Sequence, residues 1–247
     1  MTQLKKEIGL YGLTMVAIGS CIGSGIFLTP GQVAENLPAP FLILLVWAVG
    51  GLVTLTGALT FAELGAMFPE AGGVYVYLKE AYGDLFGFLY GWAYLLVISS
   101  GAIAALSIAF ATHLDFLIPL GKTGTKIAAI VSIICLTIIN IIRVKAGEIF
   151  SNIFTGLKLI AVAGIVVIGL TLGDPGLMSQ TRASTVLPGT LFSAFGLALI
   201  GVLWSYGGWQ HASYLAGEVK NARRTVPRAM IIGALVVTSA YLLINLA

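Results

Sequence analysis

Three glycines within seven residues interrupt the first long apolar segment of the chain. Residues 18–25 read IGSCIGSG, and each glycine costs a helix roughly 1 kcal/mol relative to alanine. Backbone groups freed by an interruption are tolerated in a membrane only where protein, a cavity or a ligand satisfies them. A half-helix beginning near Gly25 would present the N–H groups of Gly23, Ser24 and Gly25 to an anion such as a carboxylate. The preceding half-helix would end at Cys21 and Ile22, whose free carbonyls suit an ammonium group.

A second interruption lies in residues 204–211, which read WSYGGWQH. The carbonyls of Trp204, Ser205 and Gly207 would complete the ammonium side of the same site. A site that offers amides and carbonyls together suits a zwitterionic α-amino acid. Glycines that allow close helix packing are the alternative interpretation. We favour a binding site, because paired Gly-interrupted segments in two halves of a chain indicate the site of a secondary transporter.

A lysine inside an apolar segment is the third chemical feature. Lys158 lies about eight residues into the segment 150–172, which is roughly 12 Å of helix at about 1.5 Å per residue. A charge at mid-membrane costs at least ~2.5 kcal/mol on insertion scales, so such residues suggest a function. Snorkelling of the amine to the membrane surface is the alternative.

The elements that must position these groups are membrane spans. The chain is 58% hydrophobic and 9% charged, whereas soluble domains carry about 25% charged residues. Seven apolar segments approach the ~20 residues that a span requires, namely 10–37, 41–61, 86–110, 127–142, 150–172, 191–215 and 229–247. The first is too long for one straight helix and fits two half-helices. The sequence therefore predicts an all-α polytopic membrane protein.

The order of the spans suggests a repeat and an orientation. Interruptions in the first and sixth spans indicate a five-helix repeat, with a first repeat over about 10–172 and a second from about 191, inside one transmembrane domain over 1–247. Nine basic residues fall on the side of the N-terminus and three on the other, so we expect the N-terminus in the cytoplasm. The last span runs to Ala247 without a polar flank, and we expect the domain to be incomplete at that end.

Several motifs, in order along nearly the whole chain, resemble one family. They are GSGIF followed by PG in 23–31, AEL and GGVYVY in 62–77, YGGW in 206–209, and EVKN through VPRA in 218–229. Together they are similar to the amino acid permeases of the amino acid–polyamine–organocation superfamily, near its L-type and bacterial serine/threonine exchanger branches. Trp204-Ser205 departs from the Phe-Ala that is more usual in the L-type pattern.

The resemblance implies a leucine-transporter-like fold of two inverted five-helix repeats with discontinuous first and sixth helices. This chain would hold the first repeat and the start of the second. In similar sodium-independent permeases a fifth-helix lysine stands where sodium-coupled relatives hold a sodium ion. Lys158 would then hold backbone carbonyls or Ser20 near the first break and couple substrate binding to closure. The same amine could instead exchange a proton.

We therefore expect alternating-access transport of neutral L-amino acids across the cell membrane, by sodium-independent exchange, with proton symport as the alternative. A channel-type or structural membrane subunit is the alternative from another class. The expected partners are the L-amino acid and the lipid bilayer, and the sequence does not indicate whether an accessory subunit binds. The sequence shows no metal-ligand spacing, phosphate loop or nucleophile–base pair, so no enzyme activity, cofactor, metal or nucleic acid is expected.

Overall fold

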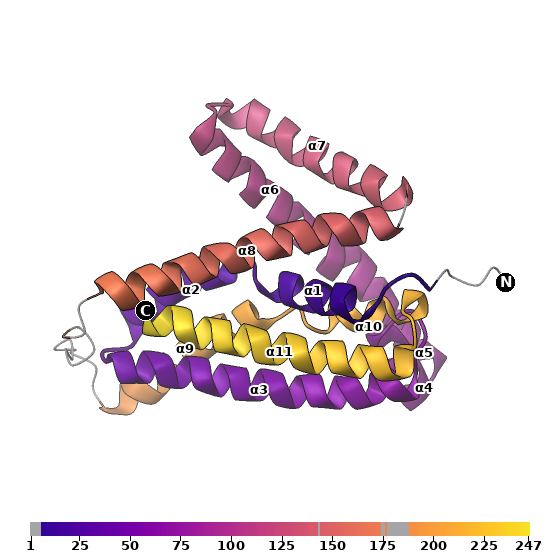
Figure 1. The fold of residues 1–247 in the computed structure, drawn as a ribbon, viewed down its shortest axis with the longest axis horizontal. Coiled ribbons are helices and arrows are strands. Elements are labelled where there is room, and N and C mark those ends of the chain that lie inside the picture. Colours follow the sequence, from indigo (N-terminus) through magenta and orange to yellow (C-terminus); the bar gives the residue numbers. More distant parts are fainter. Residues whose placement is uncertain (1–5, 143, 174–175, 177–187) are drawn as a thin grey trace. The chain divides into compact units, whose positions relative to one another are not determined.

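The computed structural model of the protein describes residues 6–142, 144–173, 176 and 188–247 (Figure 1). Helices dominate this part of the chain, which otherwise contains one isolated parallel β-bridge between Ile8 and Val219. Seven of its helical segments are long and apolar enough to cross a membrane: Leu10–Asn36, Pro40–Met67, Asp84–Leu117, Gly121–Ile141, Gly147–Leu172, Leu191–Tyr214 and Ala222–Leu246. These spans confirm the prediction of an all-α polytopic membrane protein. Basic residues used for the expected orientation include Lys5, Arg143 and Arg182, which lie outside the described residues.

Some helices extend beyond the apolar segments expected from the sequence. The second span continues to Met67 instead of residue 61, and the seventh begins at Ala222 instead of residue 229. The added turns carry charged residues, among them Glu63 and Arg224. Hydropathy detects the part of a helix within the hydrocarbon layer, and it misses polar turns that lie beyond that layer.

The chain divides into two compact units, and the first comprises residues 1–73 and 149–247. It contains α1 (Leu10–Cys21), α2 (Gly25–Asn36), α3 (Pro40–Met67), the later part of α8 (Val144–Leu172), α9 (Pro188–Tyr206), α10 (His211–Tyr214), the 3₁₀ helix η3 (Ala216–Glu218) and α11 (Ala222–Leu246). Helix α11 packs against both α1 and α3, and α9 packs against α2 and α3 (Figure 1). The two interrupted spans therefore belong to one packed unit.

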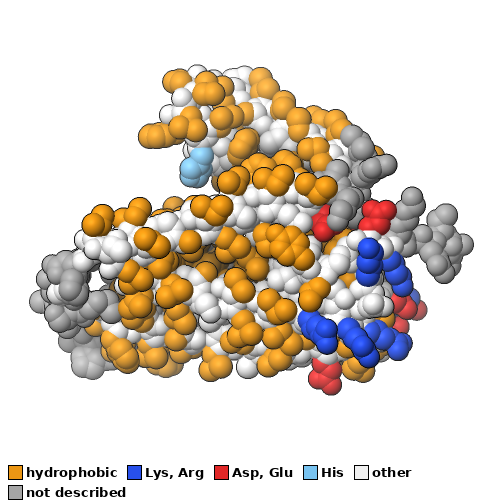
Figure 2. Space-filling view, in the orientation of Figure 1, with side chains coloured by type: hydrophobic (Ala, Val, Ile, Leu, Met, Phe, Trp, Pro, Cys, Tyr) orange, Lys and Arg blue, Asp and Glu red, His pale blue; other side chains and the backbone are white. Residues whose placement is uncertain are grey.

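Two buried apolar clusters hold this first unit together. One surrounds the helix breaks and includes Ile22, Trp47 and Tyr241, each fully buried. The other lies where α1 and α11 begin and includes Ile8 and Met230. The outer surface, in contrast, exposes large apolar side chains along the spans (Figure 2), as a lipid-facing surface does.

The second unit, residues 74–148, contains α4 (Val74–Tyr82), α5 (Asp84–Ala93), the π-helix η1 (Tyr94–Ser99), α6 (Ser100–Leu117) and α7 (Gly121–Ile142). Helices α5, η1 and α6 run on as one span, so a π-helical stretch lies in the middle of it. Asp115 closes the turn to α7 by accepting the backbone N–H groups of Leu120 at 2.6 Å and Gly121 at 2.8 Å. The candidate site does not draw on the described residues of this unit.

Candidate functional site

The first break lies where the sequence places it. Helix α1 ends at Cys21, and α2 begins at Gly25. The Ser24 carbonyl accepts the N–H groups of Phe27 at 3.2 Å and Leu28 at 3.1 Å, so Ser24 starts the second half-helix. No side chain of the described residues caps this half-helix. Its dipole therefore remains available to a ligand.

Free backbone groups surround this break. Among the described residues, the N–H groups of Gly23, Ser24 and Gly25 have no hydrogen-bond acceptor. The Ile22 carbonyl accepts no hydrogen bond from any of the described residues either. Gly23 and Ser24 are half-buried, whereas Ile22 and Gly25 are buried. Buried or half-buried backbone groups normally find partners, so their freedom at this break needs an explanation.

The second break begins later than the sequence predicts. Helix α9 continues through Trp204 and Ser205 to Tyr206, and the interruption consists of residues 207–210 before α10 begins. The Trp204 carbonyl accepts the N–H of Gly207 at 3.1 Å, and the indole side chain is 68% exposed. Trp and Ser tolerate a helix much better than Gly does, so the interruption starts only at the paired glycines.

The two breaks touch each other through glycines. Gly208 has a positive φ of 132°, and a side-chain carbon there would lie 2.8 Å from the Cys21 nitrogen. A side-chain carbon on Gly25 would lie 3.0 Å from the Cα of Ser205. Such approaches leave no room for a larger residue. The predicted site residues of the first break therefore lie directly beside those of the second.

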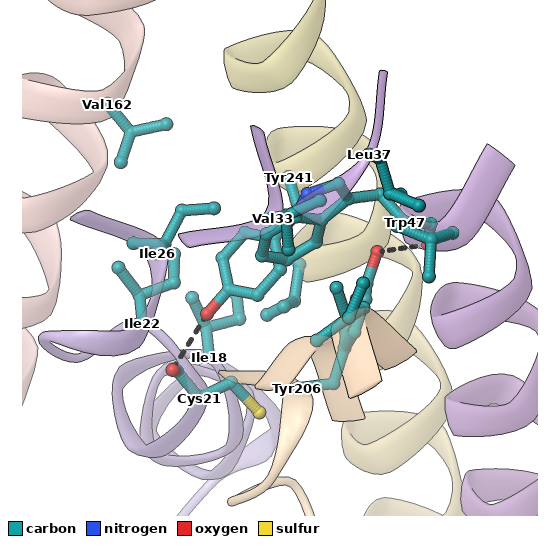
Figure 3. Packing of buried hydrophobic residues seen from close by; sticks show 14 residues of the cluster. Ile18, Cys21, Ile22, Ile26, Val33, Leu37, Trp47, Val162, Tyr206 and Tyr241 are labelled. Atoms are coloured by element: carbon teal, nitrogen blue, oxygen red, sulfur yellow. Dashed lines mark hydrogen bonds between the residues drawn. The ribbon is translucent and has the colours of Figure 1, made fainter. Parts of the chain in front are cut away.

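Tyr241 of α11 connects both breaks with its hydroxyl group. This hydroxyl donates toward the carbonyl of Cys21 at 2.8 Å and the carbonyl of Ser205 at 3.0 Å, and the side chain is fully buried. Figure 3 shows the phenol among apolar side chains, with its oxygen pointing at Cys21. Two carbonyls predicted to receive an ammonium group thus already have a hydroxyl partner, and each keeps a second lone pair.

A further hydrogen bond joins α2 to α9 beside the breaks. The Ser205 hydroxyl donates to the Thr29 hydroxyl oxygen at 2.8 Å, and both side chains are buried. The Tyr206 hydroxyl donates to the Trp47 carbonyl at 3.1 Å, which ties α9 to α3 (Figure 3). These two hydrogen bonds therefore fix α9 to both α2 and α3.

Sequence reasoning missed Tyr241 and Thr29. A signal existed for Tyr241, because a phenol in the middle of an apolar span requires a hydrogen-bond partner. Its position gives no indication of which carbonyl it meets, because that depends on the packing of three helices. Thr29 carries no comparable signal, since threonine can bond to its own helix.

Lys158 contacts the last turn of α1 from α8. Its amine donates to the Gly19 carbonyl at 3.2 Å, and no carboxylate among the described residues lies within ion-pair distance. The neighbouring Thr155 packs so closely on Gly19 that a side-chain carbon there would collide with its hydroxyl. The Ser20 hydroxyl donates instead to the Val16 carbonyl of its own helix at 2.7 Å. Lys158 therefore bonds a backbone carbonyl, one of the two partners expected for it, and Ser20 faces its own helix.

The fold and the touching breaks define a polytopic helical membrane protein with two interrupted spans in one packed unit. The family model described as amino acid permease matches residues 8–247, and the chain belongs to this family. It is 40% identical to the serine/threonine exchanger SteT of Bacillus subtilis over 99% of the chain and 55% of that protein. It is 36% identical to the human b(0,+)-type amino acid transporter 1 over 100% of the chain and 51% of that protein.

Another relative is the human Asc-type amino acid transporter 1, which is 35% identical over 99% of this chain and 48% of its own length. The chain thus spans about half the length of the curated relatives it matches. The names of these relatives describe transporters rather than enzymes.

Proposed function

We propose that the protein transports L-amino acids across the cell membrane by alternating access, and that the two touching breaks bind the substrate backbone. The observation that carries this proposal is the set of unpartnered amides at Gly23, Ser24 and Gly25, at the start of a half-helix and beside a second interrupted span. The names of the relatives support the substrate class. The geometry supports a ligand with an anionic group and a cationic group close together.

The carboxylate would bind at the start of α2. Free N–H groups at a helix N-terminus, together with the helix dipole, form a ready anion site. A carboxylate there would accept up to three of these hydrogen bonds without any charged side chain. Because only backbone groups are used, this half of the site would accept any α-amino acid.

The ammonium group would bind on the carbonyl side of the breaks. Among the described residues, the carbonyls of Ile22 and Gly207 accept no hydrogen bond. Those of Cys21 and Ser205 share the single hydroxyl proton of Tyr241. Trp204 contributes less, because its carbonyl already accepts a backbone N–H.

In its more specific form, the proposal is that the protein exchanges neutral amino acids independently of sodium. The Lys158 amine donates to the Gly19 carbonyl, two residues before α1 ends. A fixed cation there would replace a bound metal ion, because it holds the Gly19 carbonyl of the interrupted helix in place. Since the lysine stays in the protein, no cation gradient would be consumed. Proton symport, with Lys158 as the carrier, is the alternative.

The wider architecture is also part of the proposal. We place the chain as one transmembrane domain, with a first five-helix repeat over 10–172 and an inverted second repeat starting near 191. The N-terminus would lie in the cytoplasm. The interruptions of the first and sixth spans support the repeat.

Transport assays in liposomes test the proposal. The natural protein that carries this chain is reconstituted, and uptake of radiolabelled neutral amino acids is compared with and without unlabelled amino acid inside. Exchange predicts uptake that requires internal amino acid and is insensitive to replacing sodium by choline. Uptake driven by an inward proton gradient alone would select symport. Unsaturable flux that needs neither would indicate a channel-type subunit, and no flux under any condition would contradict transport.

A further inference from the structure

A basic cavity lies in the first unit, away from the helix breaks. It measures about 410 Å³ and is lined by Lys6, Pro69, Asn221, Ala222, Arg223 and Arg224. Three of the six lining side chains are cationic and none is acidic. The substrate site proposed above uses none of them.

The N-terminal segment reaches this cavity because it is bonded to the loop before α11. The N–H groups of Glu7 and Ile8 donate to the Glu218 carbonyl at 3.0 and 3.1 Å, and Lys220 N–H donates to the Ile8 carbonyl at 2.9 Å. Ile8 is buried in the apolar cluster beneath this bridge. Lys6 is therefore held two residues from a fixed anchor.

The start of α11 forms a second side of the cavity, apart from Lys6. Asn221 adopts a left-handed conformation with φ 52°, and its carbonyl accepts the N–H groups of Arg224 at 2.9 Å and Thr225 at 3.0 Å. Within the part of the chain that the structure describes, no side chain caps the helix. Among the described residues, the N–H groups of Ala222 and Arg223 have no acceptor. Two free amides and the positive end of a helix thus face the same region as the cations.

The cationic side chains of the cavity form no ion pair among the described residues. No carboxylate there lies within ion-pair distance of Lys6, Arg223 or Arg224. All three side chains are exposed. Figure 2 shows Lys and Arg side chains, with some Asp and Glu side chains among them, at the end of the unit where α11 begins. Arginine at a helix start, with free amides beside it, is the arrangement that binds phosphate groups.

The position of the cavity suggests where the phosphate comes from. Arg223 and Arg224 are the second and third residues of the span Ala222–Leu246, and Pro69 follows the span Pro40–Met67 by two residues. The cavity therefore lies at the ends of two candidate spans, which is where a span meets the lipid headgroups. Basic pockets between spans at this level bind anionic headgroups.

We propose that this cavity binds a phosphate group, carried by an anionic phospholipid or free in solution. The two arginines and Lys6 neutralise the phosphate, while the backbone N–H groups of Ala222 and Arg223 donate hydrogen bonds to its oxygens. A phosphate held there joins the N-terminal segment to the start of α11.

Binding in detergent at constant ionic strength tests this proposal without a transport assay. The natural protein is titrated with dioctanoyl phosphatidylglycerol, with dioctanoyl phosphatidylcholine and with inorganic phosphate, and the shift of its thermal unfolding midpoint gives each affinity. Variants are Arg223→Gln/Arg224→Gln and, on the other wall, Lys6→Gln. The matched control is Arg228→Gln, which removes an exposed arginine of the same helix that does not line the cavity.

We expect phosphatidylglycerol to bind at least tenfold more tightly than phosphatidylcholine. The double variant should weaken the binding of phosphatidylglycerol about 30-fold, which is about 2 kcal/mol at about 1.4 kcal/mol per tenfold. Lys6→Gln should weaken it about fivefold, and Arg228→Gln less than twofold. If inorganic phosphate binds as tightly as phosphatidylglycerol, and the variants weaken its binding by the same factors, free phosphate is identified as the ligand. Equal binding of both lipids with no response to phosphate, or a loss in Arg228→Gln as large as in the double variant, overturns the proposal.

Discussion

Replacing Tyr241 by phenylalanine removes one oxygen atom from the contact between the two breaks. The hydroxyl donates toward Cys21 of α1 at 2.8 Å and Ser205 of α9 at 3.0 Å. The phenylalanine ring fits the same space, so packing with Trp47 and Tyr206 is retained. The substitution therefore isolates the hydrogen bond from the volume of the side chain.

The expected size of the effect follows from the number of protons. One hydroxyl proton serves two carbonyls, so only one hydrogen bond, shared between them, is lost. A buried carbonyl left without a partner costs about 1–3 kcal/mol in a soluble protein, and hydrogen bonds between spans average about 0.6 kcal/mol. We therefore expect Tyr241→Phe to lower the free energy of unfolding by about 1–2 kcal/mol. If the bond forms only when both breaks are closed, the closed arrangement becomes about 5- to 30-fold less populated.

Two measurements with one matched variant test this reasoning. Thermal unfolding in detergent gives the stability, and the substrate concentration at half-maximal exchange in liposomes reports the closed arrangement. Tyr206→Phe is the control, because it removes one buried hydroxyl bond, to the Trp47 carbonyl at 3.1 Å, that involves neither Cys21 nor Ser205. It should cost similar stability while leaving half-saturation within twofold.

The role of the shared hydroxyl is refuted if Tyr241→Phe is as stable as the natural protein and exchanges substrate with the same half-saturation. It is also refuted if Tyr206→Phe shifts half-saturation as much as Tyr241→Phe does. The second result would show that general packing of the aromatic cluster, rather than the shared hydroxyl, controls closure.

Three further changes have defined outcomes. Lys158→Met removes the amine bonded to the last turn of α1, and we expect at least a tenfold fall in exchange rate, measured in liposomes. Gly208→Ala puts a carbon 2.8 Å from the Cys21 nitrogen at a positive φ, so unfolding free energy should fall by about 2–3 kcal/mol, measured by thermal unfolding. Burial, and secondly the charge of Glu7, raises the pKa of Glu218. Protonated Glu218 therefore stabilises the folded state fully below pH about 4.3, and this contribution is lost as the pH rises through the raised pKa. Glu218→Gln should be more stable than the natural protein at pH 7, and this gain should vanish below about pH 4.

Each of these predictions has a control and a contradicting result. Lys158→Arg keeps the charge and should retain part of the exchange, whereas a wild-type rate in Lys158→Met contradicts the coupling role. Gly207→Ala is the control for its neighbour, because Gly207 is exposed and a side-chain carbon there would come no closer than 3.2 Å to Trp204. Equal losses in the two glycine variants contradict the close approach. For Glu218, identical pH profiles before and after substitution contradict the raised pKa, and Glu7→Gln should reduce the difference.

The parts of this structure that the sequence predicts are those governed by local physics. Glycine placement locates the first break within a residue, because helix propensity acts locally. Composition identifies seven spans, because burial in lipid requires apolar side chains at every turn. Lys158 stands out because a lone charge in a span demands a partner.

The remaining features depend on contacts between distant segments. Ser205 lies inside α9 because neighbouring helices support that turn. Tyr241 reaches two carbonyls only when three helices are packed. The bridge between Ile8 and Val219, which places Lys6 beside α11, has no local sequence signal, since one bridged pair is too short for a strand pattern.

The contact between Tyr241 and the first break also has a consequence for biosynthesis. The hydroxyl and the Cys21 carbonyl are separated by 220 residues of chain. A ribosome adds roughly 5–20 residues per second, so Tyr241 is made roughly 10–40 s after Cys21. During that interval the first span has no Tyr241 to bond its interrupted turn. The newly made span therefore depends on water, lipid headgroups or the insertion machinery until the seventh span is synthesised.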